Sequence, residues 1–198
     1  REKMDLDIQV SKLKLMKANH TSQKYRLETD IAKNYPVQIA AQKEQIAGLR
    51  ADREAVKPIL EEKEKDNFSM MIGGKTYTDR KEAGTAILAA CAGLKAVKSN
   101  GQIGEFHGFS LNASYDSFYQ TYKLTIKRQC SYQIEIGKDV LGNLQRISNA
   151  LTGIEKRLTE AEQKMENLLS QLATAQEEVE KPFPKEAELT EKMERLAE

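Results

Sequence analysis

The sequence has few of the residues that usually build catalytic and metal centres. It contains two histidines, two cysteines and no tryptophan in 198 residues. Cys91 and Cys130 stand far apart, without a CxxC pair or a histidine nearby in sequence, so neither a metal knuckle nor a disulfide framework is indicated. This cysteine usage is typical of a reducing compartment, and we expect a cytoplasmic protein. We expect no cofactor, no metal and no catalytic residue in this chain.

Long apolar runs and aromatic residues are also scarce. No run approaches the roughly 18 apolar residues of a membrane span, and no signal peptide is visible. Hydrophobic residues make up 39% of the chain, charged residues 31% and aromatic residues 6%, which is lean for a compact globule and favours extended helices. The net charge of +1 indicates no strongly polyanionic partner. Because the sequence begins with Arg1 and ends within a helical pattern, we expect a piece of a longer protein.

What the sequence does contain is a regular apolar pattern near its C-terminal end. Apolar residues recur at spacings that alternate between three and four, and Glu, Lys, Gln and Arg fill most other positions. This heptad pattern predicts one long coiled-coil helix, and so narrow an apolar seam needs a second helix to cover it. The seam consists of Leu144, Ile147, Leu151, Ile154, Leu158, Ala161, Met165, Leu168, Leu172, Ala175 and Val179.

The N-terminal third of the chain can supply that second helix. We expect a short helix over residues 5–18 that ends near Asn19 and His20, followed by a longer helix that Thr21 or Ser22 caps. The apolar track of the longer helix consists of Leu27, Ile31, Tyr35, Ile39, Gln42, Ile46, Leu49, Arg53, Val56 and Leu60.

Four residues interrupt this second track. Gln42 and Arg53 are polar, and we interpret them as residues that fix the register of the helix pair at some cost in stability. Pro36 and Pro58 lack backbone donors, so we expect a kink or a break at each.

Residues 67–137 differ from both flanks and predict a small α+β unit. Gly73 and Gly74 indicate a tight hairpin turn, and Asp79 with Glu82 resembles the capping box of a helix over residues 79–97. Alternating apolar residues then predict antiparallel strands with one apolar face, which the 79–97 helix should cover. The expected strands are 68–72, 75–77, 103–115 with a turn near His107 and Gly108, 120–128 and 131–136.

Together these segments predict an α+β protein in which a long antiparallel coiled-coil hairpin carries a small α+β head between its arms. The three parts are an N-terminal helical arm at 1–66, the head at 67–137, and a C-terminal coiled-coil arm with a short terminal helix at 138–198. The arms are nearly equal in length from residue 21 and back to Pro182, as a monomeric hairpin requires. A parallel homodimer through the C-terminal seam is the rival arrangement.

Few residues of the head indicate a binding role. Residues 69–76 nearly match a phosphate-binding P-loop, but Ser69 replaces its first glycine and a strand, not a helix, should follow, so we favour a hairpin turn. Aromatic side chains among basic ones are more suggestive, because stacking platforms and cations hold single-stranded nucleic acid. The candidate contacts are Tyr119, Lys123, Lys127 and Arg128. Alternation directs Lys123 and Lys127 away from the apolar face and Arg128 toward it, although Arg128 sits at the strand end, where it can still reach water. An ordinary sheet surface is the alternative.

Four stretches also carry a family resemblance. They are FSMMIGGKTYTDRKEAG at 68–84, GFSL at 108–111, GNLQRISNAL at 142–151 and EKPFPKEAEL at 180–189. In this order they resemble the C-terminal region of very large bacterial proteins of conjugative elements and phages, described as SNF2-like helicase and adenine-specific DNA methylase fusions. The resemblance covers most of the chain.

This resemblance implies a part that lies beyond the helicase motor. The chain contains no helicase motif and no methylase signature of Asn or Asp followed by Pro-Pro-Tyr or Pro-Pro-Phe, so any catalytic residue would belong to other domains. We therefore expect a non-catalytic accessory domain that contacts DNA or a protein partner, with the remaining domains of the parent protein as neighbours. The alternative is a purely structural coiled-coil module that binds protein alone.

Overall fold

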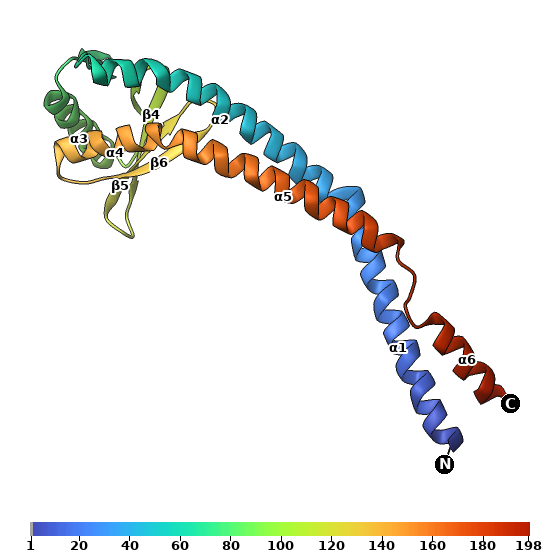
Figure 1. The fold of residues 1–198 in the computed structure, drawn as a ribbon. Coiled ribbons are helices and arrows are strands. Elements are labelled where there is room, and N and C mark those ends of the chain that lie inside the picture. The colour runs from blue at the N-terminus through green and yellow to red at the C-terminus, as the bar shows by residue number, and fades with distance from the viewer. Residues whose placement is uncertain (1) are drawn as a thin grey trace. The chain divides into compact units, whose positions relative to one another are not determined.

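The computed structural model describes residues 2–198 and combines long helices with one antiparallel sheet, as the sequence predicted (Figure 1). The chain forms two compact units. The terminal unit contains the chain up to Lys43 together with Gln163–Glu198, and the sheet unit is Glu44–Glu162. Among residues 2–198, no helix has both the length and the apolar composition that crossing a membrane requires.

The terminal unit is built around the first and last helices, α1 (Glu2–Thr29) and α6 (Glu186–Ala197). Val10 and Leu13 of α1 bury themselves against Leu189 of α6. At the edge of this core, Lys17 forms an ion pair with Glu186 at 2.7 Å. The predicted terminal helix is confirmed, and it begins after Pro182 and Pro184 because proline cannot continue the preceding helix.

The expected break near Asn19 and His20 is wrong, because α1 passes through both residues without interruption. Both have modest helix propensity, but neither glycine nor proline is present to end the helix. Thr21 does not cap a new helix; its hydroxyl donates to the Lys17 carbonyl at 3.0 Å inside α1. His20 packs its ring 5.7 Å from that of Phe183.

The two predicted irregularities at proline have different outcomes. A π-helical turn, η1 (Asp30–Asn34), stands just before Pro36, at the point where the proline deprives the helix of a donor. The next helix, α2 (Tyr35–Glu64), then continues through Pro58 without a break. An irregularity at Pro36 is thus confirmed and a break at Pro58 is not found.

The sheet unit contains six antiparallel strands in the order β2-β1-β3-β4-β5-β6. The predicted hairpins are confirmed, and the Gly73-Gly74 turn has positive φ at both residues, which glycine adopts without strain. The strands are β1 (Met70–Ile72), β2 (Lys75–Tyr77), β3 (Gly101–Phe106), β4 (Phe109–Asp116), β5 (Thr121–Lys127) and β6 (Ser131–Ile136).

Two helices cover the apolar face of this sheet. α3 (Arg80–Ala96) begins at Asp79, whose carboxylate accepts from the Glu82 amide at 2.9 Å, and it lies against β1 to β4 as expected. α4 (Val140–Thr152) packs on β6 and on α3, a second cover that the sequence analysis did not assign. The core face of the sheet includes Phe109, Leu111, Leu124 and Ile126, all fully buried.

The long C-terminal seam is buried, but the predicted single helix is divided. Gly153 separates α4 from α5 (Ile154–Glu180). Every seam residue from Leu144 to Val179 is nevertheless buried or half-buried. The seam begins in the helix that packs on the sheet: Leu144 and Ile147 belong to α4, which lies against β6.

The predicted track of α2 fails at its end. Leu60 is 42% exposed, whereas its neighbour Ile59 is 6% exposed. Ile59 and Glu62 line the same small cavity as Phe68 and Ile147, so the last turns of α2 face the sheet unit's core and no longer follow a heptad seam. Heptad spacing holds only where helix packs on helix.

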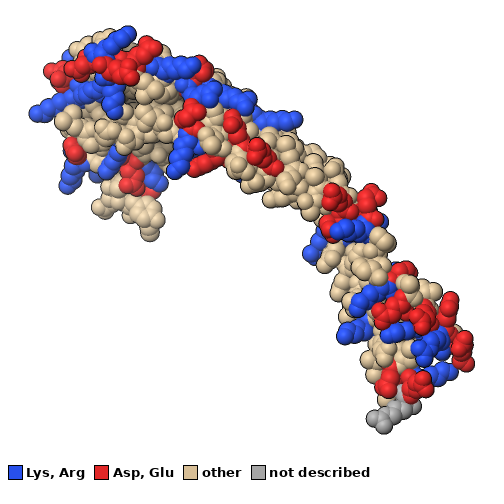
Figure 2. Space-filling view, viewed as in Figure 1, with Lys and Arg blue, Asp and Glu red and all other residues tan. Residues whose placement is uncertain are grey.

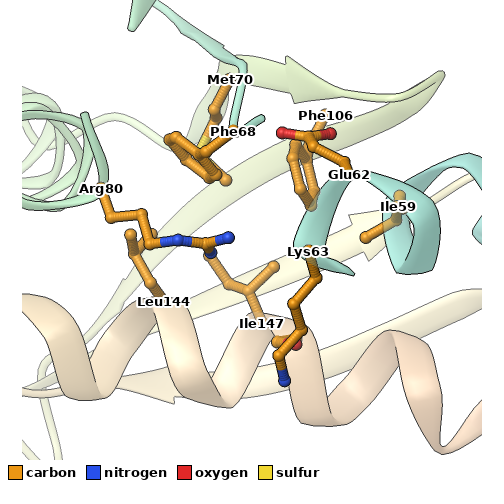
Figure 3. A pocket seen from close by; sticks show the side chains of 10 residues that line it. Ile59, Glu62, Lys63, Phe68, Met70, Arg80, Phe106, Leu144 and Ile147 are labelled. Carbon is orange, nitrogen blue, oxygen red and sulfur yellow. The ribbon is translucent and has the colours of Figure 1, made fainter. Parts of the chain in front are cut away.

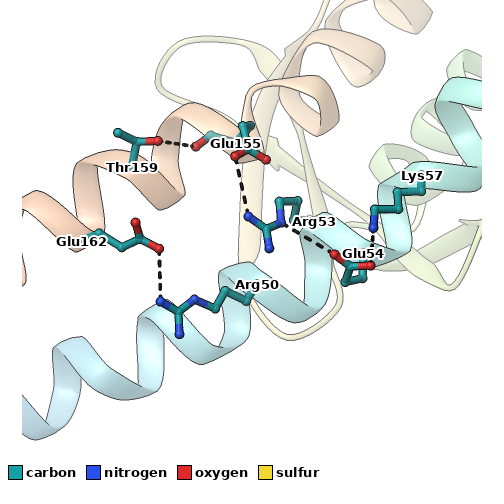
Figure 4. Close-up of polar contacts among 7 residues, drawn as sticks. All are labelled: Arg50, Arg53, Glu54, Lys57, Glu155, Thr159 and Glu162. Carbon is teal, nitrogen blue, oxygen red and sulfur yellow. Dashed lines mark hydrogen bonds and ion pairs between the residues drawn. The ribbon is translucent and has the colours of Figure 1, made fainter.

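Within the sheet unit, α2 and α5 run antiparallel. Arg50 pairs with Glu162 at 3.2 Å and Arg53 with Glu155 at 3.6 Å, so a later residue of α2 meets an earlier residue of α5 (Figure 4). Arg53 is thus half-buried at the edge of the helix pair. These exposed pairs contribute little stability each and mainly record how the helices align.

Candidate nucleic-acid interface

The end of the β4–β5 hairpin presents two aromatic side chains to solvent. Asp116, the last residue of β4, accepts hydrogen bonds from the amides of Phe118 at 3.0 Å and Tyr119 at 3.2 Å, and so fixes the turn. The Tyr119 amide, with smaller effects from Phe118 and Lys123, lowers the pKa of Asp116. Phe118 is 84% and Tyr119 68% exposed. We call this pair the aromatic tip.

The end of the β4–β5 hairpin, which projects below the sheet unit in the view of Figure 1, is drawn without charged residues at its extremity (Figure 2). The two rings meet edge to face with centroids 4.8 Å apart, and both side chains remain mostly exposed. Exposure of an aromatic pair to water is unfavourable in the unbound protein. Contact with a flat apolar surface would remove the rings from water and would therefore be favourable.

A recess of about 430 Å³ lies next to the tip, between the end of α3 and β4. The Lys95 ammonium stands 4.7 Å above the centre of the Tyr115 ring, and Tyr122 packs beside that ring at 5.1 Å. The recess is lined by Leu94, Lys95, Lys98, Ser99, Asn100, Tyr115 and Ser117.

The electrostatic balance at this end of the sheet unit is positive. Lys123 lies 3.5 Å from Asp116, so that carboxylate is matched by a cation as well as by two amides. Lys95 and Lys98 form no ion pair within residues 2–198. Two ammonium groups therefore remain available to an anion beside the aromatic tip.

The structure does not bring the four predicted contact residues together. Tyr119 lies in the turn before β5 and Lys123 in the first half of that strand. Lys127 ends the strand, roughly 13 Å from Lys123 at 3.3 Å per residue. Lys123 and Lys127 alternate with the buried Leu124 and Ile126, so they occupy the face that the sequence analysis assigned to them.

Arg128 directly follows the last residue of β5, its side chain is 34% exposed, and its guanidinium donates to Asp52 of α2 at 3.2 Å. Asp52 is fully buried and also accepts from the amides of Gln129 at 3.0 Å and Cys130 at 2.8 Å, and from the Tyr132 hydroxyl at 2.8 Å. This network anchors α2 to the β5–β6 turn. Arg128 therefore lies at the surface, but its guanidinium is already engaged by Asp52.

The buried network also sets the chemistry of nearby groups. Burial, reinforced by Asp52, raises the pKa of both Tyr132 and Cys130. Burial raises the pKa of Cys91 to about 11. Both thiols are thus held in the protonated form, which is a weak nucleophile at neutral pH.

A second buried carboxylate, Glu62, accepts from the Ser69 amide and pairs with His107. His107 lies in the predicted turn, at a positive φ of 47°, and its side chain is 28% exposed. The adjoining cavity holds only about 20 Å³, room for roughly one water molecule (Figure 3). No substrate-sized site exists at this position.

Sequence reasoning missed Lys95 and Lys98 as parts of the interface. The sequence gives little indication of their role, because Lys95 and Lys98 lie at and just after the end of α3. Only the tertiary fold brings that end next to β4. Within residues 2–198, no cluster of three or more His, Cys, Asp or Glu side chains could hold a metal ion. Residues 69–76 form the β1–β2 hairpin, with no helix at Lys75 to bind phosphate.

Comparison with known proteins gives no match: no protein-family model fits the chain, and no curated protein and no solved structure matches it.

Proposed function

We propose that this chain is a non-catalytic accessory domain of a larger DNA-processing protein, and that its sheet unit binds single-stranded nucleic acid at the end of the β4–β5 hairpin. The observation that carries the proposal is the aromatic tip: Phe118 and Tyr119 are held out by the Asp116 turn, beside lysines that lack acidic partners. Stacking surfaces next to cations are the usual means of holding a single strand.

The geometry favours single strands over duplexes. Bases in a duplex are paired and stacked within the helix, so an aromatic ring can reach them only where the strands are open. Lys123 near the turn of the hairpin, with Lys95 and Lys98 at the end of α3, would attract the phosphates without reading sequence.

The resemblance to helicase and DNA methylase fusion proteins supports the same proposal. In such a protein the chemistry would belong to other domains, and this chain would hold or guide the strand. A bacterial mobile element or phage would be the source of the parent protein, and its remaining domains would be the neighbours of this chain.

We further propose that α2 and α5 form an antiparallel coiled-coil hairpin in which the α+β head is inserted. Support comes from the Arg50–Glu162 and Arg53–Glu155 pairs and from the buried seam of α5, including Leu158, Leu168 and Ala175. A helical pair of this kind would be a stiff support for the binding unit.

The coiled-coil proposal is testable with spin labels on cysteines that replace Arg50 and Glu162, in a chain with Cys130→Ser. We expect a short distance that persists when labelled chain is diluted with unlabelled chain, and a monomer by light scattering. A distance that disappears on dilution, together with a dimeric mass, would establish the parallel homodimer instead.

A titration of labelled DNA against the full chain tests the binding function. We expect tighter binding to a single strand than to a duplex of equal length, with affinity that falls as salt increases. No single-strand binding at about 50 mM salt would overturn the function.

Two matched variants locate the contact. Tyr119→Ala should weaken single-strand binding by roughly 5- to 150-fold, since stacking contributes about 1 to 3 kcal/mol per base. Tyr25→Ala removes an equally exposed tyrosine of α1 and should leave binding unchanged. Equal losses in both variants would contradict a contact at the tip.

The alternative function is a purely structural module that binds protein. It is favoured by the apolar character of Phe118, because exposed aromatic residues also anchor protein interfaces. The DNA titration separates the two, since a protein-binding tip predicts no salt-dependent affinity for single strands.

A further inference from the structure

The two lysines of the recess are held by the fold on one wall. Lys95 lies in the last turn of α3, and Lys98 follows the helix with a positive φ of 51°. The Lys98 amide bonds the Lys95 carbonyl at 3.1 Å, and the Ser99 amide bonds the Leu94 carbonyl at 2.9 Å. The chain that carries both ammonium groups is therefore ordered by its own hydrogen bonds.

Tyr115 positions one of these cations and does not offer a free stacking surface. The Lys95 ammonium covers its ring at 4.7 Å, and Tyr122 packs against it at 5.1 Å. The Tyr115 amide also donates to the Asn100 side chain at 3.4 Å, which ties β4 to the segment between α3 and β3. The recess is thus suited to an anionic group more than to a base.

The size and polarity of the recess fit a sugar-phosphate unit. Its volume of about 430 Å³ falls within the range of small-molecule sites, roughly 300 to 1,000 Å³. Besides the two ammonium groups, Ser99, Asn100 and Ser117 line it and supply hydroxyl and amide groups for hydrogen bonds.

The recess and the aromatic tip are directly connected. Ser117 lines the recess, and the next residue, Phe118, belongs to the tip. Their Cα atoms are therefore about 3.8 Å apart. A strand whose base stacks on the tip would have its backbone within reach of Lys95 and Lys98.

From these contacts we infer that the recess is a phosphate subsite, and that the bound strand crosses from the aromatic tip toward α3 instead of following Lys123 to Lys127 along β5. This inference rests on the proposed single-strand binding. It names the group that the recess takes, a phosphate diester or monoester, and the path of the strand.

Salt dependence of binding to the full chain tests the path. For Lys95→Gln with Lys98→Gln, we expect the slope of log affinity against log salt to become shallower by about 1.4, the value for two single-strand phosphate contacts. The control pair Lys14→Gln with Lys43→Gln removes two exposed lysines of the terminal unit that form no ion pair within residues 2–198, and its slope should not change.

A second arm tests phosphate binding in the recess directly, with two small ligands. Inorganic phosphate and deoxyadenosine monophosphate are added separately while the amide signals of Ser99, Asn100 and Ser117 are followed by NMR. We expect both ligands to shift these signals in the unmodified chain and neither to do so in the Lys95, Lys98 variant. Unchanged amide signals elsewhere in α3 show that the variant is folded.

The outcomes distinguish this inference from the function on which it rests. If single-strand binding is present and sensitive to Tyr119→Ala, but Lys127→Gln flattens the salt slope and the recess pair does not, the strand follows β5 and the recess assignment is overturned. If no single strand binds at all, the proposed function fails, whatever phosphate does in the recess.

Discussion

The hydroxyl of Tyr132 on β6 donates to the fully buried carboxylate of Asp52 on α2 at 2.8 Å. The two residues are 80 positions apart in the chain. With the Gln129 and Cys130 amides, this bond holds the middle of a long helix on the turn of a hairpin. A buried acceptor with several donors of this kind is costly to disrupt, because each donor would lose its partner without gaining water.

Asp52→Ala should therefore destabilise the protein by about 3 to 5 kcal/mol, the usual cost of removing one member of a buried charged network. Chemical denaturation measures the loss. Glu61→Ala changes an exposed acid of the same helix and should leave the unfolding midpoint nearly unchanged. Equal midpoints for the two variants would show that the network contributes nothing.

Gly84 and Gly93 form a matched pair within α3. A Cβ atom at Gly84 would lie 2.4 Å from the Val140 Cγ1 atom and 2.8 Å from its carbonyl oxygen, so Gly84→Ala should cost about 1 to 3 kcal/mol through overpacking. Gly93 has open space, and Gly93→Ala should stabilise the helix by about 1 kcal/mol. Thermal unfolding would reveal shifts of opposite sign, and a stabilising Gly84→Ala would exclude the close contact of α3 and α4.

Leu158 and Leu169 test the buried face of α5 in the same way. Leu158 is 2% exposed and Leu169 is 48% exposed. Leu158→Ala should cost about 2 to 5 kcal/mol, because it leaves a cavity between packed elements. The loss for Leu169→Ala should be much smaller. Similar losses measured by denaturation would contradict the assigned face.

The turn at the aromatic tip should depend on pH through Asp116. Its amide hydrogen bonds and Lys123 favour the carboxylate, so its pKa in the folded state is lowered from the ordinary 3.8. The turn contributes fully above the ordinary pKa and weakens as pH falls through the lowered one. An NMR titration should give a midpoint below 3.8, with the Phe118 and Tyr119 amides moving in parallel. A midpoint at or above 3.8 would contradict the turn geometry.

Local patterns accounted for much of the fold. Gly73 and Gly74 specify a two-residue turn through their positive φ, Asp79 specifies a helix start through its side chain, and alternation along β5 specifies which residues face the core. Each rule involves residues close in sequence, so the chain needs no information from elsewhere to obey it.

Other features depended on contacts between distant segments. The exposure of Leu60, the division of the seam at Gly153 and the burial of Asp52 arise where helices meet the sheet, and heptad spacing describes only helix against helix. Arg128 was expected at a surface and has its partner in Asp52, 76 positions away.

The candidate interface combines both kinds of information. Tyr119 and Lys123 were recognisable because aromatic and basic residues are close together in that stretch of the chain. Lys95 and Lys98 come beside the aromatic tip only because α3 packs across the sheet and ends at β4. Burial of the apolar faces of α3 and the sheet drives that packing, and it brings together polar groups whose positions in the sequence carry no sign of their proximity.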